Sequence, residues 1–249
     1  MNIAIIGKYV ELKDAYKSLD EALTHGGIQN NVKVNLVRID SEKLKVSEIK
    51  SKLKHISGIL IAGGFGKRGT TGKIESIKYA RKNKVPFLGI CYGMQMAIIE
   101  FARNQLNLKK ATSSEFDRNG IPVIGLINEW IKDGKTIKGT DKNLGGTMRL
   151  GSYDAKLQNN SKIKKIYGKK IIKERHRHRY EVNINLKDKF EKKGMSFSGL
   201  SPDGFLPEII ELKNHPWFIG VQFHPEFKSR PFAPHPLFSS FIKASKNHK

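Results

Sequence analysis

Cys91, the only cysteine among 249 residues, is the strongest candidate for covalent chemistry. It lies between Gly89 and Gly93, at the end of an apolar run and just before a helical pattern. Flanking glycines allow the tight strand-to-helix turn that holds a nucleophile at a helix N-terminus, whose dipole favours a thiolate. A free cysteine is also often an inert buried side chain. The pentapeptide alone leaves catalysis and packing about equally open.

The second candidate for chemistry is the tripeptide His224-Pro225-Glu226, which follows another apolar run. In extended backbone, residues i and i+2 point to the same side, so we expect the imidazole and the carboxylate to project together. The carboxylate would fix the tautomer of the imidazole and stabilise its cation. Such an imidazole can deprotonate a thiol and later protonate a leaving amine. Alone, this tripeptide is more typical of a surface turn, but with Cys91 it favours a Cys-His-Glu triad.

Residues 63–66, Gly-Gly-Phe-Gly, also follow an apolar run. The backbone N–H groups of Gly64 and Tyr92 are candidate donors to an oxyanion that develops beside the cysteine. The continuation at 66–74 approaches a phosphate-binding loop, but its glycine spacing is wrong and Ile74 replaces the required Ser or Thr. We interpret residues 63–66 as an oxyanion loop.

Residues 174–181 alternate arginine with histidine, which is consistent with a metal site or with a basic surface strand. His176 and His178 share one face at period two, but no carboxylate or cysteine stands at a typical metal spacing, so we expect no metal. The alternating Arg175, Arg177 and Arg179 suit recognition of a carboxylate or phosphate, because guanidinium binds both in bidentate fashion.

The elements that must position these groups alternate between strands and helices. Apolar patterns predict strands at residues 3–6, 32–39, 56–62, 85–90, 152–157, 195–200, 207–212 and 218–223. Helices are predicted at 12–26, 43–54, 74–82, 94–106, 162–167 and 237–244, the first ended by Gly26 and Gly27. Residues 107–148 look looser, with a strand and turn at 122–130 and a candidate mobile loop at 132–146. This order predicts an α/β fold with a mostly parallel central sheet, helices on both faces and ligands at the carboxyl ends of the strands.

Composition predicts one globular domain over residues 1–249, with 38% hydrophobic and 28% charged residues. The single cysteine suits a reducing compartment, and no apolar run reaches the ~20 residues of a membrane span, so we expect a cytoplasmic protein. The formal charge of +23 comes mostly from lysines scattered along the chain. Since Lys, Asn and Ile share A/T-rich codons, base composition explains this excess better than specific nucleic-acid binding, which we do not expect.

Five segments together resemble the glutaminase domain of CTP synthase, a class I glutamine amidotransferase with a flavodoxin-like fold and a small antiparallel extension. They are residues 63–69 (GGFGKRG), 89–95 (GICYGMQ), 145–151 (GGTMRLG), 174–183 (ERHRHRYEVN) and 224–227 (HPEF). The opening at 7–16 is similar too, so the resemblance covers residues 3–245. The elbow and His-Pro-Glu are shared by class I amidotransferases in general, whereas the 145–151 and 174–183 segments are specific to CTP synthase.

The resemblance implies a role for each matching residue. Cys91 would attack the side-chain amide of glutamine and release ammonia, His224 would act as base and acid, and Glu226 would orient it. Glu115 would face the ammonium of the glutamine and Arg179 its carboxylate. The implied glutamine-binding set is Gly64, Tyr92, Gly93, Met94, Gln95, Glu115 and Arg179. Phe65, Gly66 and Arg68 match a loop linked in this family to activation by GTP.

The sequence departs from the family pattern beside the nucleophile, where Tyr92 replaces the usual Leu, and before the oxyanion loop, where Ala62 replaces Pro. The amidoligase domain that uses UTP, ATP and Mg²⁺ is also missing, so we expect no cofactor in this chain. Expected partners are L-glutamine and an amidoligase domain or subunit, in an enzyme that forms a homo-oligomer, a tetramer. Two alternatives remain open: a stand-alone hydrolase of γ-glutamyl compounds, and an inactive regulatory or polyanion-binding module.

Overall fold

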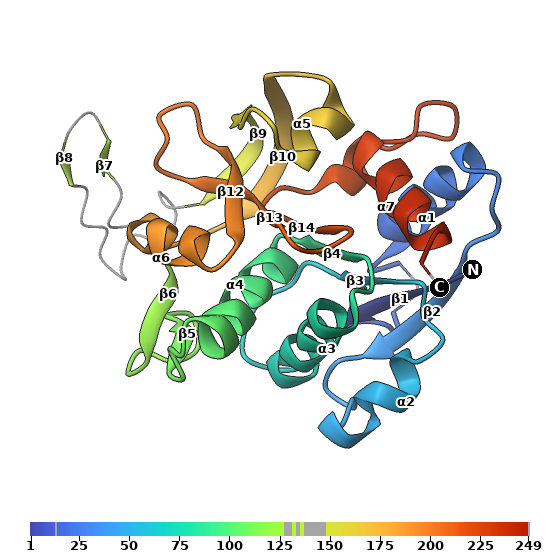
Figure 1. Cartoon of the computed structure of the whole chain (residues 1–249), viewed down its shortest axis with the longest axis horizontal. Helices are drawn as coiled ribbons and strands as arrows, with labels where there is room; N and C mark the ends of the chain where they lie inside the picture. The colour runs from blue at the N-terminus through green and yellow to red at the C-terminus, as the bar shows by residue number, and fades with distance from the viewer. Residues whose placement is uncertain (13, 127–130, 133–134, 137–147, 249) are drawn as a thin grey trace.

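The computed structural model describes residues 1–12, 14–126, 131–132, 135–136 and 148–248 (Figure 1). In this part of the chain, a nine-stranded sheet has the order β10-β9-β12-β13-β14-β4-β3-β1-β2. The parallel half consists of β1 (Asn2–Gly7), β2 (Asn35–Asp40), β3 (Gly58–Ile61), β4 (Phe87–Ile90) and β14 (Phe218–Val221). The antiparallel half consists of β13 (Pro207–Leu212), β12 (Met195–Leu200), β9 (Arg149–Leu157) and β10 (Ile171–His178). The mostly parallel sheet with an antiparallel extension is therefore confirmed.

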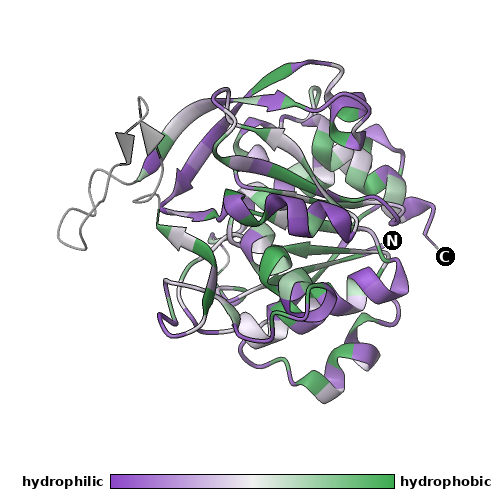
Figure 2. Ribbon diagram, turned by 60° about the vertical axis from the view of Figure 1, so that its left-hand side comes forward, coloured by the Kyte–Doolittle hydropathy of each residue, from purple (hydrophilic) through white to green (hydrophobic). Residues whose placement is uncertain are grey.

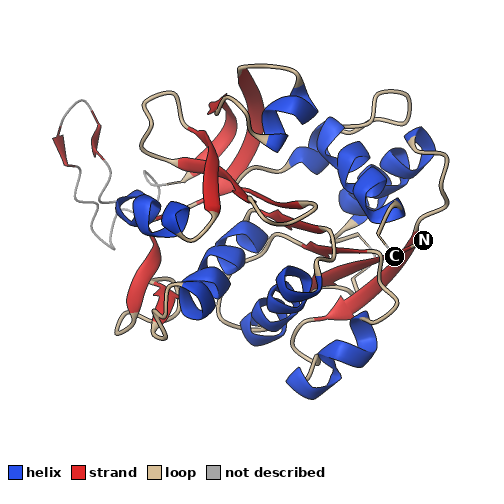
Figure 3. Cartoon of the chain, viewed as in Figure 1, coloured by secondary structure: helices blue, strands red, loops and turns tan. Residues whose placement is uncertain are grey.

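Helices cover both faces of the sheet, as Figures 1 and 3 show. They are α1 (Lys17–Gln29), α2 (Ile49–Leu53), α3 (Thr70–Asn83), α4 (Tyr92–Gln105), α5 (Lys162–Tyr167), α6 (Lys187–Lys192) and α7 (Pro236–Lys246). A smaller sheet joins β11 (Tyr180–Val182), β6 (Ile121–Leu126) and β5 (Ala111–Ser113), and β7 (Ile131–Lys132) pairs with β8 (Lys135–Thr136). Short 3₁₀ turns occupy Val46–Glu48, Ile184–Leu186 and Pro225–Lys228.

The inner parallel strands β1, β3, β4 and β14 are buried on both sides, and alternate residues of each strand enter different cores. Ala4 and Ile6 of β1 pack into the core that contains α3 and α4, whereas Ile3 and Ile5 pack into the core that contains α1 and α7. Near-continuous apolar runs are typical of such strands. The same apolar interior is visible in Figure 2.

The first predicted helix was placed wrongly at both ends, because α1 begins at Lys17 and continues through Gly26 and Gly27 to Gln29. These glycines do not end the helix but allow close packing. A Cβ on Gly26 would lie 3.0 Å from the Phe238 carbonyl oxygen of α7, and one on Gly27 would lie 2.8 Å from the Val32 carbonyl oxygen. α1 and α7 lie side by side in Figure 1.

The other predicted elements occur within a few residues of their expected positions, and residues 162–167 form α5 as predicted. The strand expected in residues 122–130 occurs as β6, whereas β5 was not predicted. The expected turn at 127–130 and most of the expected loop at 132–146 lie outside the described residues. Within the described ranges, no helix is both long and apolar enough to cross a bilayer.

Candidate active site

Cys91 lies at a sharp turn between β4 and α4, as the glycine pattern predicted. Its backbone has φ 51° and ψ −103°, a strained conformation for a non-glycine residue, and it caps the N-terminus of α4. A Cβ on Gly89 would lie 2.8 Å from the Gly93 carbonyl carbon, and one on Gly93 would lie 2.3 Å from the Ile61 carbonyl oxygen. Only glycine allows this crowding, so the turn holds the thiol at the carboxyl end of β4.

His224 and Glu226 meet as predicted, although not through an extended backbone. Glu226 lies in the 3₁₀ turn Pro225–Lys228, and His224 Nδ1 donates to Glu226 Oε1 over 2.7 Å. This bond leaves Nε2 of His224 for the thiol of Cys91. Burial by itself lowers the pKa of His224, but the Cys91 thiolate and the Glu226 carboxylate outweigh it and raise this pKa to about 10. The geometry therefore favours a protonated imidazole beside Cys91.

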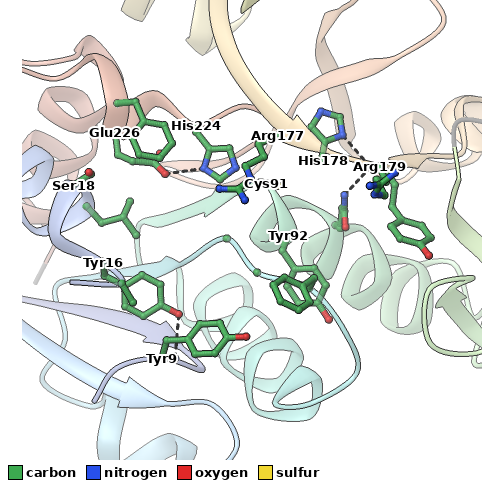
Figure 4. A pocket seen from close by; sticks show the side chains of 18 of the residues that line it. Tyr9, Tyr16, Ser18, Cys91, Tyr92, Arg177, His178, Arg179, His224 and Glu226 are labelled. Atoms are coloured by element: carbon green, nitrogen blue, oxygen red, sulfur yellow. Dashed lines mark hydrogen bonds and ion pairs between the residues drawn. The ribbon is translucent and has the colours of Figure 1, made fainter. Parts of the chain in front are cut away.

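These three residues line one pocket of about 680 Å³, shown in Figure 4. Gly64, which is 27 positions before Cys91, lines the same pocket because β3 and β4 are adjacent parallel strands. Other predicted site residues on its wall are Phe65, Tyr92, Gln95, Glu115 and Arg179. The carboxyl ends of the strands thus form the crevice that the sequence predicted.

Four predicted site residues do not line this pocket. The Met94 side chain is fully buried in the core below the pocket, and Gly93 is packed against Ile61. Gly66 is not among the lining residues, and its N–H donates to Glu115 Oε1 over 2.7 Å. Arg68 is exposed and pairs with Glu42. Gly93 and Met94 therefore shape the elbow without lining the pocket.

Tyr92, the unusual residue after the nucleophile, fixes the loop that carries Phe65 and Gly66. Its ring is buried, and its hydroxyl donates to the Gly66 carbonyl oxygen. The same loop residue binds the Glu115 carboxylate, whose pKa is raised by burial against the opposing effects of the Gly66 N–H and Lys8. Tyr92 and Glu115 therefore attach the loop to the pocket at two adjacent points.

We expect Tyr92→Phe to lower the free energy of unfolding by about 0.5–1.5 kcal/mol, because a part-buried hydrogen bond is lost while the ring remains. Urea denaturation measures this difference. Tyr79→Phe on α3 is the matched control, since it removes a tyrosine hydroxyl away from the pocket. Equal stability of Tyr92→Phe and the wild-type chain would contradict this role of the Tyr92 hydroxyl.

A buried polar network supports the corner between β10 and β11, where Arg179 lies. Arg149 pairs with Glu181 at 3.0 Å and with Glu208 at 2.7 Å, and burial raises the pKa of both carboxyl groups against the opposing effect of this guanidinium. His176 Nδ1 and His178 Nε2 are 2.9 Å apart on the inner face of β10. Burial lowers the pKa of both imidazoles, to about 3 for His178, so they are neutral. This network fixes the corner between β10 and β11.

The strand at 171–178 thus has two faces, because its arginines point outward and its histidines inward. Among the described residues, no group of three or more His, Cys, Asp or Glu could hold a metal ion.

Lys73, from the segment similar to a phosphate loop, is buried and donates to Ser41 Oγ over 3.2 Å. Burial lowers its pKa to about 8. This lysine is therefore internal and does not line an open phosphate site.

Two further residues of the site, Tyr16 and Gln222, were not predicted from the sequence, whereas Arg177 is one of the alternating arginines that the sequence marked as candidates. Arg177 lines the pocket beside Arg179, and Tyr16 lines it from the segment before α1. The Tyr16 hydroxyl accepts hydrogen bonds from the N–H groups of Lys8 and Tyr9 at 3.1 and 3.3 Å. Gln222 donates from Nε2 to Cys91 Sγ over 3.6 Å. Its position two residues before His224 was a usable signal, whereas nothing local marks Tyr16.

The family follows from comparison with known proteins. The profile described as Glutamine amidotransferase class-I matches residues 11–244, nearly the whole chain. The chain belongs to the class-I glutamine amidotransferase family.

Within this family the chain is similar to CTP synthases. It is 87% identical to the CTP synthase of Pelagibacter ubique over 249 residues, which are 100% of this chain and 46% of that relative. It is 56% identical to the Rhodospirillum rubrum CTP synthase over 98% of this chain and 45% of the relative. The chain thus spans a little under half the length of these relatives.

The structure is similar to the glutaminase domain of Trypanosoma brucei CTPS with bound acivicin. The TM-score is 0.88 at 33% identity, and the match covers 100% of this chain and 95% of that one. A glutamine amidotransferase from Thermotoga maritima shares the fold, with a TM-score of 0.56 at 12% identity over 99% of this chain and 96% of that one. The resemblance inferred from the motifs is therefore confirmed, and with it the class I amidotransferase fold.

Proposed function

We propose that this chain hydrolyses the side-chain amide of L-glutamine to glutamate and ammonia. The observation that carries the proposal is the convergence of Cys91, His224 and Glu226 in the pocket that Glu115 and Arg179 also line. A charged residue of each sign at one pocket matches the ammonium and carboxylate of an amino acid. Family membership supports the same reaction.

The reaction follows from the geometry in two stages. The Cys91 thiolate attacks the amide carbon, and the protonated His224 gives its proton to the leaving nitrogen, so ammonia departs and a thioester remains. Neutral His224 then takes a proton from water, whose oxygen attacks the thioester carbon. The sulfur leaves as the thiolate and the product is glutamate. Glu226 holds the Nδ1–H of His224 throughout and stabilises the imidazolium.

The backbone N–H of Gly64 is the proposed donor to the oxyanion, together with that of Tyr92. We expect Gly64→Pro to lower kcat about 10²–10³-fold, because proline has no N–H to donate. Gly64→Ala is the matched control. Its N–H remains, and the nearest heavy atom to a Cβ there is Lys8 Cε at 4.0 Å. Similar losses of kcat in both variants would argue against an oxyanion role, provided that thermal unfolding shows both to be folded.

The substrate is tested by measuring glutamate release by the 249-residue chain from glutamine and from γ-glutamyl peptides. We expect free glutamine to be the better substrate. Faster cleavage of the peptides would favour a γ-glutamyl hydrolase. Absence of both activities, together with salt-sensitive RNA binding and no labelling of Cys91 by a glutamine-like electrophile, would favour an inactive module.

The role of the released ammonia is a wider proposal, supported by the similarity to CTP synthases. Ammonia would aminate UTP to CTP in a synthase domain that uses ATP and Mg²⁺, within a cytoplasmic homo-oligomer, and GTP would activate hydrolysis through the loop containing Phe65, Gly66 and Arg68. A pull-down from the source cell that recovers an amidoligase on the same or a separate polypeptide tests the partner. Ammonia release with and without GTP tests the activation.

A further inference from the structure

Gln222 approaches the nucleophile from the core, on the side away from substrate. Its side chain is fully buried, it does not line the pocket, and its Nε2 lies 3.6 Å from Cys91 Sγ. Backbone hydrogen bonds connect this segment to its neighbours on either side. Gln222 N donates to the Glu208 carbonyl oxygen, and Cys91 N donates to the carbonyl oxygen of Val221, the residue before Gln222. The amide therefore reaches the reacting sulfur without reaching the space for glutamine.

The orientation of this amide is fixed by neighbours. Gln95 Nε2 lies 2.9 Å from the Tyr180 carbonyl oxygen, which can only accept, and 3.2 Å from Gln222 Oε1. The Gln95 amide must therefore turn its NH₂ group toward both oxygens. This leaves the NH₂ group of Gln222 facing Cys91 Sγ, as in the bond described. His178 Nδ1 also donates to the Tyr180 carbonyl, over 3.2 Å, and so connects this chain of bonds to the buried network.

We propose that Gln222 is a further catalytic residue, which stabilises the Cys91 thiolate through its Nε2–H, and that Gln95 is the positioning residue that orients it. Hydrogen bonds to ionised groups are stronger than those to neutral groups, and Gln222 is fully buried, so its NH₂ group is shielded from solvent. Gln222 thus supplements His224, the protonated partner of the same thiolate. The inference rests on the proposed nucleophilic role of Cys91.

The test combines two variants of Gln222 with a direct measurement of the thiol. Gln222→Met keeps the volume and removes the donor, whereas Gln222→Glu places an oxygen against the sulfur. We expect both to shift the pH midpoint of Cys91 alkylation by iodoacetamide upward, by about one pH unit, which is a tenfold change. At neutral pH, kcat should fall about tenfold or more, with KM for glutamine within about twofold, because Gln222 does not line the pocket. Gln158→Glu, at an exposed glutamine, is the control.

A folded Gln222→Met variant with an unshifted alkylation midpoint would overturn the proposal. If both variants fail to fold, the wild-type chain decides. In protein labelled with ¹⁵N-glutamine, the side-chain NH₂ signal of Gln222 should follow the alkylation midpoint and should stop doing so in Cys91→Ala. A signal insensitive to pH in the wild-type chain would equally overturn the proposal. Absence of glutamine hydrolysis would instead refute the proposed function, and the alkylation profile would still test Gln222.

Discussion

Cys91→Ala is expected to abolish ammonia release from glutamine, with a loss of about 10⁶-fold in kcat, because the thioester cannot form without the sulfur. The fold should persist, since the side chain removed is small and its backbone is held by β14 through the bond from Cys91 N to the Val221 carbonyl, at 2.7 Å. Ammonia release measured by a coupled assay, with circular dichroism of the same sample, checks both parts.

Ser76→Ala is the matched control for this substitution. It also removes one heteroatom from a buried side chain, the hydroxyl that donates to the Gly72 carbonyl in α3, but it lies outside the pocket. We expect it to retain normal activity. Glutaminase activity of Cys91→Ala comparable to that of the wild-type chain would refute the nucleophilic role, and with it the proposed function.

Glu226→Gln should lower kcat roughly 10⁴-fold while leaving the chain folded, because the carboxylate both fixes the tautomer of His224 and stabilises its cation. The substitution keeps the size of the side chain but removes its charge at 2.7 Å from Nδ1. The pKa of His224 should therefore fall below its wild-type value of about 10. The alkaline limb of the kcat profile should move to lower pH in the variant.

The same pKa predicts a stability difference with a defined sign. A histidine whose pKa is raised from 6.5 to about 10 on folding stabilises the native state fully below pH 6.5 and not at all above about pH 10. The free energy of unfolding of the wild-type chain should lose this contribution as pH rises through that window, and the Glu226→Gln variant should lose less. An unchanged alkaline limb in the variant would contradict the assigned pair. Glu75→Gln on α3 serves as a control away from the pocket.

The sequence predicted that Cys91, His224 and Glu226 would come together because its signals are local. Gly89 and Gly93 mark the crowded turn around Cys91, and His224-Pro225-Glu226 keeps imidazole and carboxylate two residues apart. The alternation of strands and helices similarly predicted the parallel sheet and the edge at which Gly64 and Cys91 meet. The expected route to the His224–Glu226 contact was wrong in one respect, since a 3₁₀ turn rather than an extended strand brings the two side chains together.

Only the tertiary structure decided which side chains reach the pocket and which support it. Met94 belongs to the recognisable elbow motif, yet its place on α4 directs it into the core. Tyr16 and the amide of Gln222 reach the site through packing between segments far apart in sequence. Gly26 and Gly27 look like a helix end, but contacts with α7 and with the Val32 carbonyl override that local preference. Backbone turns, and contacts between side chains a few residues apart, are determined by the local sequence. Burial and long-range hydrogen bonds depend instead on how the whole chain packs.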